Sequence, residues 1–165
     1  SLRAGVMVTK IEDSVIIDAP VEAVFGYASD WRRWPEWFEG LSDVRSTSEI
    51  GRGPGARYTY QVRVLGFPAR VETELRDFVE GQGWTGVGTR GLPHQTQWRF
   101  EGQGDSTKFT YRLEYRLPPV LLGTMLDALF AKREWCGIIR RSLLNLREHF
   151  SRAASRETAK GSYGV

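Results

Sequence analysis

Between about Leu41 and Leu117, apolar and polar residues alternate along the chain with a period of two. The apolar or aromatic sets are Tyr58, Tyr60, Val62 and Val64; Ala69, Val71, Thr73 and Leu75; Thr96, Trp98 and Phe100; and Phe109, Tyr111, Leu113, Tyr115 and Leu117. This alternation is typical of antiparallel strands with one buried and one solvated face. Glycine- and proline-containing turns separate the stretches. With a β-branched segment at residues 12–18, the pattern predicts about seven strands.

Helical spacing appears on both sides of this region. Pro20 fits the first turn of a helix, so a helix is predicted over residues 21–29. Pro35 limits residues 30–38 to one or two short turns. After Pro118-Pro119, residues 121–150 contain no proline and present one apolar stripe at about 100° per residue. The stripe consists of Leu121, Met125, Ala128, Trp135, Cys136, Ile139, Leu143, Leu146 and Phe150. A long helix is predicted here, and a break near Ala131 is left open.

The order of these elements predicts an α+β fold. A curved seven-stranded antiparallel sheet would wrap around the long C-terminal helix, with two short helices after the first strand. A single sheet must bury its apolar face, and the terminal helix is the one predicted element large enough to cover it. Residues 1–150 are expected to form one domain, and residues 151–165 a polar, peripheral tail. Whether Trp84 and Trp98 fill the space between sheet and helix or line a hollow is left open.

Composition and charge narrow the classes of function. The net charge is +3, and charges of both signs alternate instead of forming a basic stripe, which argues against nucleic-acid binding. A single cysteine excludes an internal disulfide, and no Cys/His/Asp cluster has metal-ligand spacing, so we expect neither metal nor cofactor. No run of about 18 apolar residues predicts a membrane span, and residues 1–10 lack the apolar block of a signal peptide. A cytoplasmic location is therefore expected.

Several short motifs, taken in order, resemble one superfamily. They are the strand–Ala-Pro–helix opening at Val15–Phe25, Ser29-Asp30-Trp31, Trp34-Pro35-Glu36-Trp37, Trp98-Arg99-Phe100, the Gly-Asp-Ser-Thr turn at 104–107, and Pro118-Pro119. Over roughly residues 12–150 the chain resembles the START-like helix-grip (SRPBCC) superfamily, and within it the polyketide cyclase/dehydrase and lipid-transport branch. The resemblance implies a deep hydrophobic cavity between sheet and helix, and no fixed catalytic set.

A cavity for a lipophilic ligand needs apolar walls and a few polar groups that orient the ligand. The residues expected to line it are Trp37, Phe38, Tyr58, Tyr60, Val62, Val71, Trp84, Trp98, Tyr111, Leu113, Tyr115, Met125, Lys132, Cys136 and Ile139. Each tyrosine either packs in the core with its hydroxyl at the edge or donates to the ligand from the cavity wall. At least one of them is expected to line the cavity.

The catalytic candidates are Lys132, His94 and Tyr111. Lys132 falls within the apolar stripe, where its stem could pack while the ammonium reaches solvent. The alternative is a partly buried amine that faces the cavity and binds an acidic ligand or moves protons. His94 begins a predicted strand and suits acid–base chemistry near neutral pH, although a position in the rim or turn is the plainer interpretation. Cys136 is interpreted as a buried structural thiol, because no adjacent base is identified.

Three functions follow from these features. The first is a carrier or binding protein for a small hydrophobic, lipid- or polyketide-like molecule. The second is an enzyme of the polyketide cyclase, aromatase or dehydratase type that uses a tyrosine, His94 or Lys132 for proton transfer. The third is a partner-binding module, with a homodimer formed through an exposed sheet edge. A convergent polar set with a perturbed imidazole or amine would favour the enzyme, and a uniformly apolar hollow would favour the carrier.

Overall fold

The computed structural model describes residues 8–64, 66–117 and 125–162 and confirms the α+β helix-grip fold. Its elements are β1 (Val8–Ile17), α1 (Val21–Ala28), the 3₁₀ turn η1 (Trp31–Arg33), α2 (Trp34–Trp37), β2 (Ser42–Ser46), β3 (Arg57–Val64), β4 (Phe67–Val79), β5 (Gly83–Arg90), β6 (His94–Gln103), β7 (Ser106–Arg116) and α3 (Met125–Gly161). All strands pair antiparallel in one seven-stranded sheet of order β1-β7-β6-β5-β4-β3-β2.

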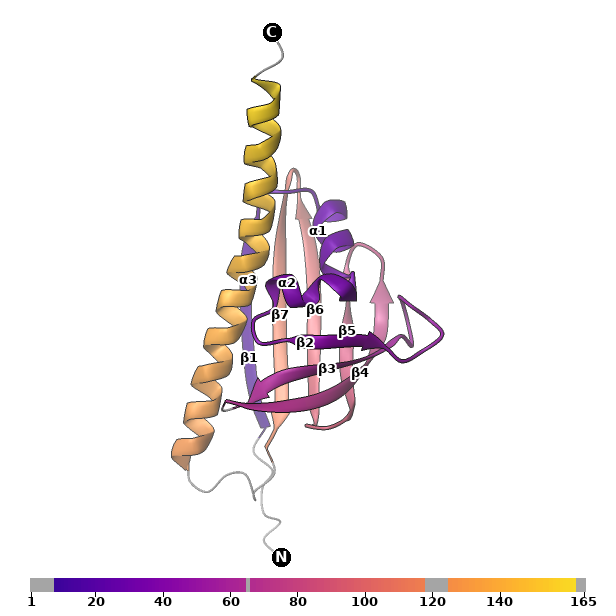
Figure 1. Ribbon diagram of the computed structural model, residues 1–165, viewed down its shortest axis with the longest axis vertical. Coiled ribbons are helices and arrows are strands. Elements are labelled where there is room, and N and C mark those ends of the chain that lie inside the picture. The colour runs from indigo at the N-terminus through magenta and orange to yellow at the C-terminus, as the bar shows by residue number, and fades with distance from the viewer. Residues whose placement is uncertain (1–7, 65, 118–124, 163–165) are drawn as a thin grey trace, which may run out of the picture.

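The sheet curves strongly across its width. In Figure 1, β1, β7 and β6 run alongside α3, whereas β2, β3 and β4 cross at a steep angle. The pairing of β4 with β5 shifts register between Glu72 and Thr73 and again between Arg76 and Val79. Between the latter two, Asp77 takes a positive φ of 51°. Such bulges bend a strand and increase its twist, and they help to turn β4 across the end of α3.

The two short helical segments after α1, namely η1 and α2, carry aromatic side chains into the interior. Asp30 begins the first of them, with its carboxylate accepting a hydrogen bond from the Arg32 N–H at 3.1 Å. Pro35 stands in the first turn of α2, as expected from its fixed φ. The Trp34 indole N–H donates to the Ala28 carbonyl at 2.9 Å, which fixes the ring under the end of α1.

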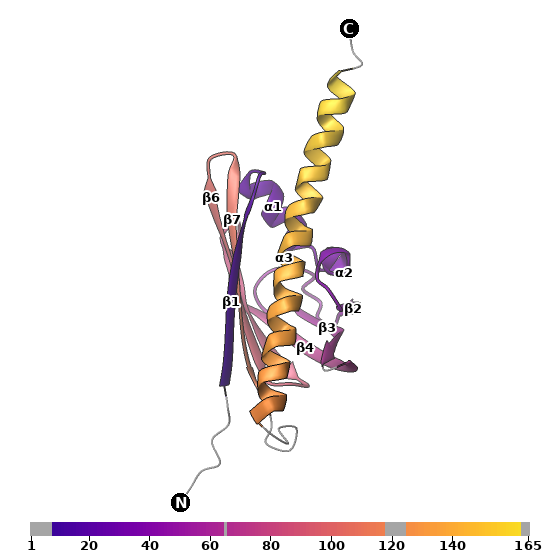
Figure 2. The same ribbon diagram turned by 90° about the vertical axis from the view of Figure 1, so that its left-hand side faces the viewer.

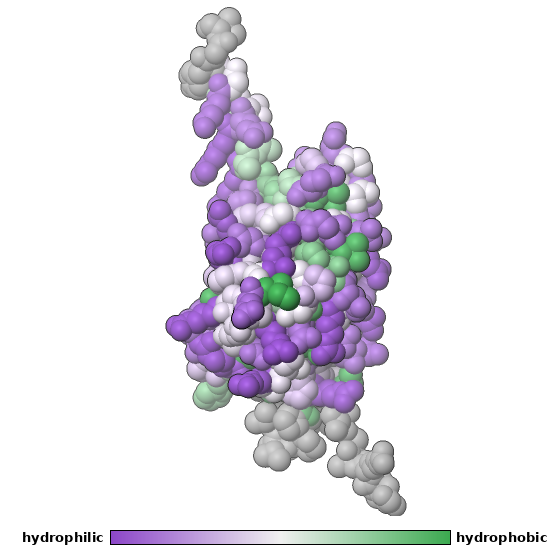
Figure 3. Space-filling model, turned by 90° about the vertical axis from the view of Figure 1, so that its right-hand side faces the viewer, coloured by the Kyte–Doolittle hydropathy of each residue, from purple (hydrophilic) through white to green (hydrophobic). Residues whose placement is uncertain are grey.

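Helix α3 packs on the inner face of the sheet through one stripe of side chains. Ala131, Ile138, Ile139, Leu143 and Leu146 are all buried. Figure 2 shows the helix lying beside β1, with α2 on its other flank. The opposite side of the sheet faces solvent, and the side of the molecule in Figure 3 is predominantly hydrophilic, with only separate hydrophobic spots. The core therefore sits between the curved sheet and α3.

Polar contacts hold the middle of α3 from both sides. Arg140 donates to Asp13 and to the Ser14 carbonyl of β1, at 3.3 and 3.2 Å. On the other side, the Ser142 hydroxyl accepts from the Glu39 N–H at 2.9 Å, and the Asn145 amide donates to the Trp37 carbonyl at 3.2 Å. Arg141 forms an ion pair with Glu39 as well. These contacts join the two ends of the curved structure through one helical segment.

Two boundaries differ from the sequence-based predictions, and the open question of a break near Ala131 is answered. Strand β1 starts at Val8, four residues before the predicted start, because it pairs with β7 along its full length. Helix α3 runs through Ala131 without a break. It also continues to Gly161, so the exposed segment after residue 150 is helical and projects beyond the sheet (Figure 2). The predicted role of Pro118-Pro119 lies outside the described residues. Among the described helices, none is both long and apolar enough to cross a membrane.

Leu143→Ala is expected to lower the free energy of unfolding by about 2–5 kcal/mol, since it leaves a cavity under α3. Leu143 is fully buried, whereas Leu129 on the same helix is 62% exposed. Leu129→Ala is the matched control and should change stability by less than about 0.5 kcal/mol. Urea unfolding monitored by tryptophan fluorescence measures both. Equal losses in the two variants would contradict the proposed burial of the α3 stripe.

Candidate ligand cavity

An internal cavity of about 70 Å³ lies between the inner face of strands β3 to β7 and the segments α2 and α3. Its walls are mainly apolar and aromatic. The lining residues are Trp34, Phe38, Leu41, Tyr60, Val62, Val71, Thr73, Leu75, Trp84, Gly86, Leu92, His94, Thr96, Trp98, Tyr111, Leu113, Tyr115, Arg116, Leu117 and Trp135. Of these, Tyr60, Leu92, His94, Arg116 and Trp135 are not fully buried, and Leu92, Arg116 and Trp135 mark a mouth where the β5–β6 turn meets the end of β7.

Much of the space between sheet and helix is filled by stacked rings. Trp84 and Trp98 are buried and stack on each other with ring centroids 4.6 Å apart. Phe100 and Phe109 form a second stack at the same separation, further from the mouth. These rings close one end of the interior, and Trp84 and Trp98 also form part of the cavity wall. The two tryptophans therefore fill part of the interior and also line the cavity.

The structure brings most of the predicted lining residues together at this cavity: Phe38, Tyr60, Val62, Val71, Trp84, Trp98, Tyr111, Leu113 and Tyr115. Three others are buried but face elsewhere. Trp37 packs against Phe38 and Trp98, Tyr58 donates to the Gly51 carbonyl at 2.9 Å, and Ile139 lies in the α3 stripe. The Met125 side chain lies outside the described part of the chain.

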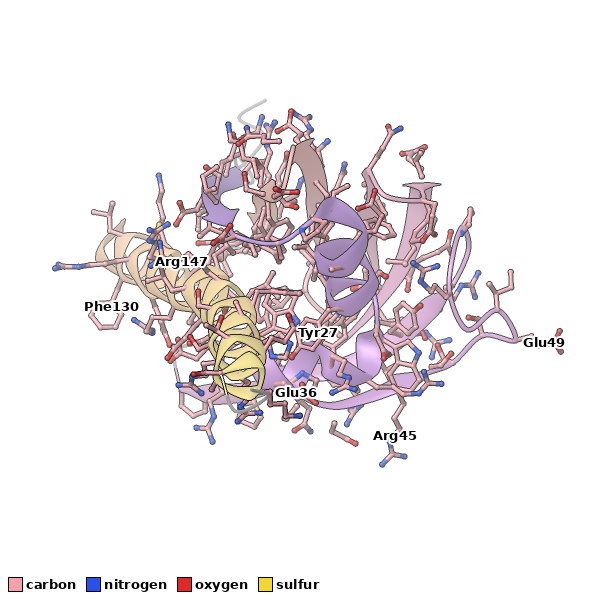
Figure 4. All side chains as sticks on the ribbon, turned by 90° about the horizontal axis from the view of Figure 1, so that it is seen from above. Tyr27, Glu36, Arg45, Glu49, Phe130 and Arg147 are labelled. Atoms are coloured by element: carbon pink, nitrogen blue, oxygen red, sulfur yellow. The ribbon has the colours of Figure 1, made fainter. Side chains whose placement is uncertain are left out.

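Lys132 and Cys136 are exposed and do not line the cavity, so the interpretation of either as a cavity residue is corrected. In the first half of α3 the helix faces the core with Ala128, Ala131, Trp135 and Ile138, and in the second half with Ile139, Ser142, Leu143 and Leu146. The buried face therefore shifts around the helix axis as α3 crosses the sheet. A helical wheel averaged over the whole helix placed both residues too close to the centre of the apolar stripe. In Figure 4, Phe130 likewise points away from the sheet.

Two glycines on the inner face of β5 provide room for the polar side chains of the cavity. A Cβ atom at Gly86 would lie 2.5 Å from the Thr96 hydroxyl oxygen and 3.0 Å from the Thr73 methyl group. A Cβ atom at Gly88 would lie 2.6 and 2.8 Å from Nδ1 and Cε1 of His94. Side chains of β4 and β6 therefore meet across β5, which lacks side chains at these points. The Gly86 and Gly88 pair was the available signal in the sequence, and it was missed.

Across this gap, a chain of hydrogen bonds links three strands. The Tyr60 hydroxyl lies 2.8 Å from Thr73 Oγ1, and Thr73 Oγ1 lies 3.0 Å from His94 Nε2. His94 Nδ1 lies 2.7 Å from the Leu92 carbonyl oxygen. Because a carbonyl only accepts, Nδ1 carries the proton, and Nε2 of a neutral ring must accept from Thr73. Tyr60 then donates to Thr73, so the direction of every bond in the chain is fixed.

Burial keeps these groups uncharged. It lowers the pKa of His94, against a smaller opposing effect of the Leu92 carbonyl. It raises the pKa of Tyr60 and raises that of Tyr111 well above its usual value, with the nearby Tyr60 adding to the latter shift. At neutral pH the imidazole and both phenols are therefore neutral.

Three further hydroxyls belong to the cavity wall. Tyr111 is buried and makes no hydrogen bond to a described residue. The buried Tyr115 hydroxyl has no partner that meets hydrogen-bond geometry among the described residues, although the nearby Thr9 side chain acts to lower its pKa against the larger, raising effect of burial. Thr96 accepts from the Trp98 indole N–H at 3.2 Å, which leaves its own proton available. Since buried polar groups normally find partners, these hydroxyls are suited to a ligand or to water inside the cavity.

Comparisons with known proteins agree with this architecture. The sequence profile of the family described as polyketide cyclase / dehydrase and lipid transport matches residues 8–151. The chain belongs to this family. Among curated protein sequences, the search found no significant match.

Several solved structures share the fold of this chain at low sequence identity. A protein of Thermus thermophilus superimposes with a TM-score of 0.75 at 18% identity, covering 88% of this chain and 99% of its own. A START superfamily protein from Mycobacterium smegmatis superimposes with a TM-score of 0.69 at 18% sequence identity, covering 85% of this chain and 97% of its own. The Zhui aromatase/cyclase from a Streptomyces species superimposes with a TM-score of 0.67 at 15% sequence identity, covering 90% of this chain and 96% of its own. At such identities the likeness establishes the fold alone.

Gly86→Ala is expected to reduce the free energy of unfolding by about 1–3 kcal/mol, because the added methyl overlaps the Thr96 hydroxyl. Gly26→Ala serves as the control, since nothing lies within 4 Å of a Cβ at that exposed position in α1. There the substitution should stabilise by about 0.5–1 kcal/mol through helix propensity. Thermal unfolding followed by circular dichroism measures both. Stabilisation by both substitutions would contradict the close packing across β5.

The lowered pKa of His94 predicts a dependence of stability on pH. Above the usual histidine pKa of 6.5, the imidazole is neutral in both the folded and the unfolded chain, so its protonation does not reduce the free energy of unfolding. As the pH falls below that value, the unfolded chain gains a proton that the folded chain resists, so stability decreases. Between about pH 7.5 and about pH 5.5, the loss in Tm should be smaller in His94→Gln than in the wild type.

His149→Gln is the control for this measurement, because burial also lowers the pKa of His149, which lies in the second half of α3. In Figure 4 Tyr27 and Glu36 lie beside α3, and the Tyr27 ring stacks on the His149 ring with centroids 3.9 Å apart. His149→Gln should retain the part of the pH dependence that His94 causes. An unchanged pH dependence in His94→Gln would contradict the burial of its imidazole.

Proposed function

We propose that this domain binds a small, uncharged hydrophobic molecule that carries at least one oxygen atom, as a binding or carrier protein. The observation that carries the proposal is the combination of apolar, aromatic walls with neutral hydroxyl groups in one cavity. Apolar walls supply affinity, and a few placed polar groups supply orientation. Tyr111, Tyr115 and Thr96 each offer a hydroxyl proton to an oxygen of the ligand.

The absence of charge in the wall supports an uncharged ligand. Among the described lining residues, Arg116 at the mouth is the one charged side chain. Lys132, the cation expected inside, is exposed. A carboxylate transferred into this cavity would lose hydration without gaining a paired charge, which is costly. A ketone, phenol or alcohol meets no such cost.

The cavity volume limits the size of the enclosed part of the ligand. A buried water needs roughly 10–15 Å³, so about 70 Å³ has room for several waters. An apolar cavity of about 150 Å³ in an engineered protein holds benzene. In the present case a single ring therefore requires adjustment of wall side chains, and a larger molecule extends through the mouth past Leu92 and Trp135.

A second candidate function is catalysis of the aromatase/cyclase type. The observation that favours it is the hydrogen-bonded chain from Tyr60 through Thr73 to His94, which a passive container does not need. A partly buried imidazole of lowered pKa with a fixed tautomer is a common element of acid–base sites. Zhui, whose fold this chain shares, is named as an aromatase/cyclase, as is the di-domain StfQ of the steffimycin biosynthetic pathway.

Phenol and cyclohexanone are suitable first probes, because each is a single uncharged ring with one oxygen. Val71→Phe places an extra ring in the cavity and should weaken their binding by at least about tenfold, equivalent to about 1.4 kcal/mol. Val79→Phe, at a position that is 47% exposed, is the matched control and should bind like the wild type. Titration calorimetry and ligand-observed NMR measure the affinities.

Native mass spectrometry of protein purified from cells complements these titrations. A co-purifying lipophilic mass that is lost in Val71→Phe and kept in Val79→Phe would identify the natural ligand. The proposed binding function fails if neither probe binds saturably to the wild type and no small molecule co-purifies.

A further inference from the structure

We propose that Tyr60, Thr73 and His94 form a proton relay with which the cavity catalyses proton transfer at a carbon next to a carbonyl group. Tyr60 is the catalytic residue that contacts the substrate, and His94 exchanges protons with it only through Thr73. The inference rests on the proposed function, because the carbonyl compound must first bind in the cavity.

The geometry of the relay comes from four adjacent strands. Tyr60 extends from β3, Thr73 from β4 and His94 from β6, while Gly88 of β5 lies between them. Thr73 pairs with Gly88 across the β4–β5 ladder. The His94 ring crosses β5 only because position 88 has no side chain. A glycine that opens a path for one imidazole toward one hydroxyl is more than core packing requires.

His94 has no free nitrogen for the ligand. Its Nδ1–H donates to the Leu92 carbonyl at 2.7 Å, and its Nε2 accepts from Thr73 at 3.0 Å. Thr73 in turn accepts from Tyr60 at 2.8 Å. The Tyr60 oxygen keeps lone pairs that are not used within this chain of bonds, and Tyr60 lines the cavity. Thr73 is held between its two partners, whereas Tyr60 stands at the open end of the chain, so we assign proton uptake from a bound molecule to Tyr60.

Tyr111 is positioned to hold the carbonyl oxygen. Tyr111 lines the same cavity as Tyr60, and burial, which raises its pKa, keeps its hydroxyl protonated. A neutral donor of this kind stabilises the negative charge that develops on an enolate oxygen. Donor and relay thus sit on the same cavity wall, as deprotonation next to a carbonyl requires.

The step balances without any co-reactant. The Tyr60 oxygen takes a proton from the carbon next to the carbonyl, while the Tyr60 proton moves to Thr73 and the Thr73 proton moves to His94 Nε2. The electron pair of the broken C–H bond moves to the carbonyl oxygen, where Tyr111 donates. The products are an enolate and an imidazolium. Reversal of the relay returns the proton to the same carbon or to the far carbon of a conjugated enolate, which isomerises the substrate.

Cyclohex-3-enone tests the relay, since its conversion to conjugated cyclohex-2-enone requires this step and is followed by ultraviolet absorbance. General acid–base catalysis contributes about 10²–10⁴-fold, so Tyr60→Phe and Thr73→Val should each lower kcat by at least about 10²-fold. Thr73→Ser keeps the hydroxyl and should restore the rate to within about tenfold of the wild type. Tyr58→Phe removes a hydroxyl from the same strand outside the cavity and should leave the rate unchanged.

The pH profile separates a relay from a structural role of Thr73. In the wild type, kcat should fall on the acid side as His94 becomes protonated, and Thr73→Val should lose this dependence because His94 is disconnected. Cyclohexanone, which has no double bond to shift, measures binding in every variant.

The outcomes are distinguishable. Saturable cyclohexanone binding without isomerisation above the solution rate overturns the relay and leaves the binding function standing. The same holds if Thr73→Val retains both the rate and the pH profile of the wild type. If cyclohexanone and phenol fail to bind, the proposed function fails first, and the relay fails with it. Loss of rate in Tyr60→Phe and Thr73→Val, with binding kept and Thr73→Ser active, supports the relay.

Discussion

The contact between α3 and the inner face of the sheet is the interaction on which the other features depend. One curved sheet has a single apolar face, and α3 is the one long helix that the structure places over it. The helix is held at its middle by Arg140 on the β1 side and by Ser142 and Asn145 on the α2 side. The space on either side of that held segment must then be filled by side chains or left open. Aromatic rings fill the end near α1, and the cavity occupies the end near Trp135.

The polar part of the interior depends on the absence of side chains at Gly86 and Gly88 of β5. A strand with ordinary side chains at positions 86 and 88 would separate the residues of β4 from those of β6. Glycine at both positions costs conformational entropy and removes packing surface, so the strand gives up stability at these points. The absence of side chains at these two positions leaves space on the inner face of the sheet, where Thr73, Thr96 and His94 approach one another. The neighbouring buried rings provide the low polarity that keeps these groups neutral.

Much of the fold follows from sequence periodicity. The period of two located β3, β4, β6 and β7, because alternate residues of an antiparallel sheet meet different environments. The glycine-containing β5 was bounded only by the turns on either side of it. The same alternation placed Tyr60, Val71 and Tyr111 on the inner face. It could not separate Tyr58, whose hydroxyl turns to the Gly51 carbonyl, from Tyr60, because periodicity gives the face of a strand and not the direction of a ring. Lys132 was misplaced for a related reason: a straight helical wheel ignores how α3 crosses the sheet. The relay was not predictable, since it needs the strand order and the register of β4, β5 and β6.

The single missing methyl group at Gly88 has a consequence for comparing sequences. Any side chain there would push the His94 ring away from Thr73, so the two residues could both be present in a relative and still be unconnected. In a sequence alignment, the threonine, the glycine and the histidine at these three positions should therefore be scored as one combined feature. Scored that way, it would separate relatives in which the histidine reaches the threonine from relatives in which a side chain at the glycine position keeps the two residues apart.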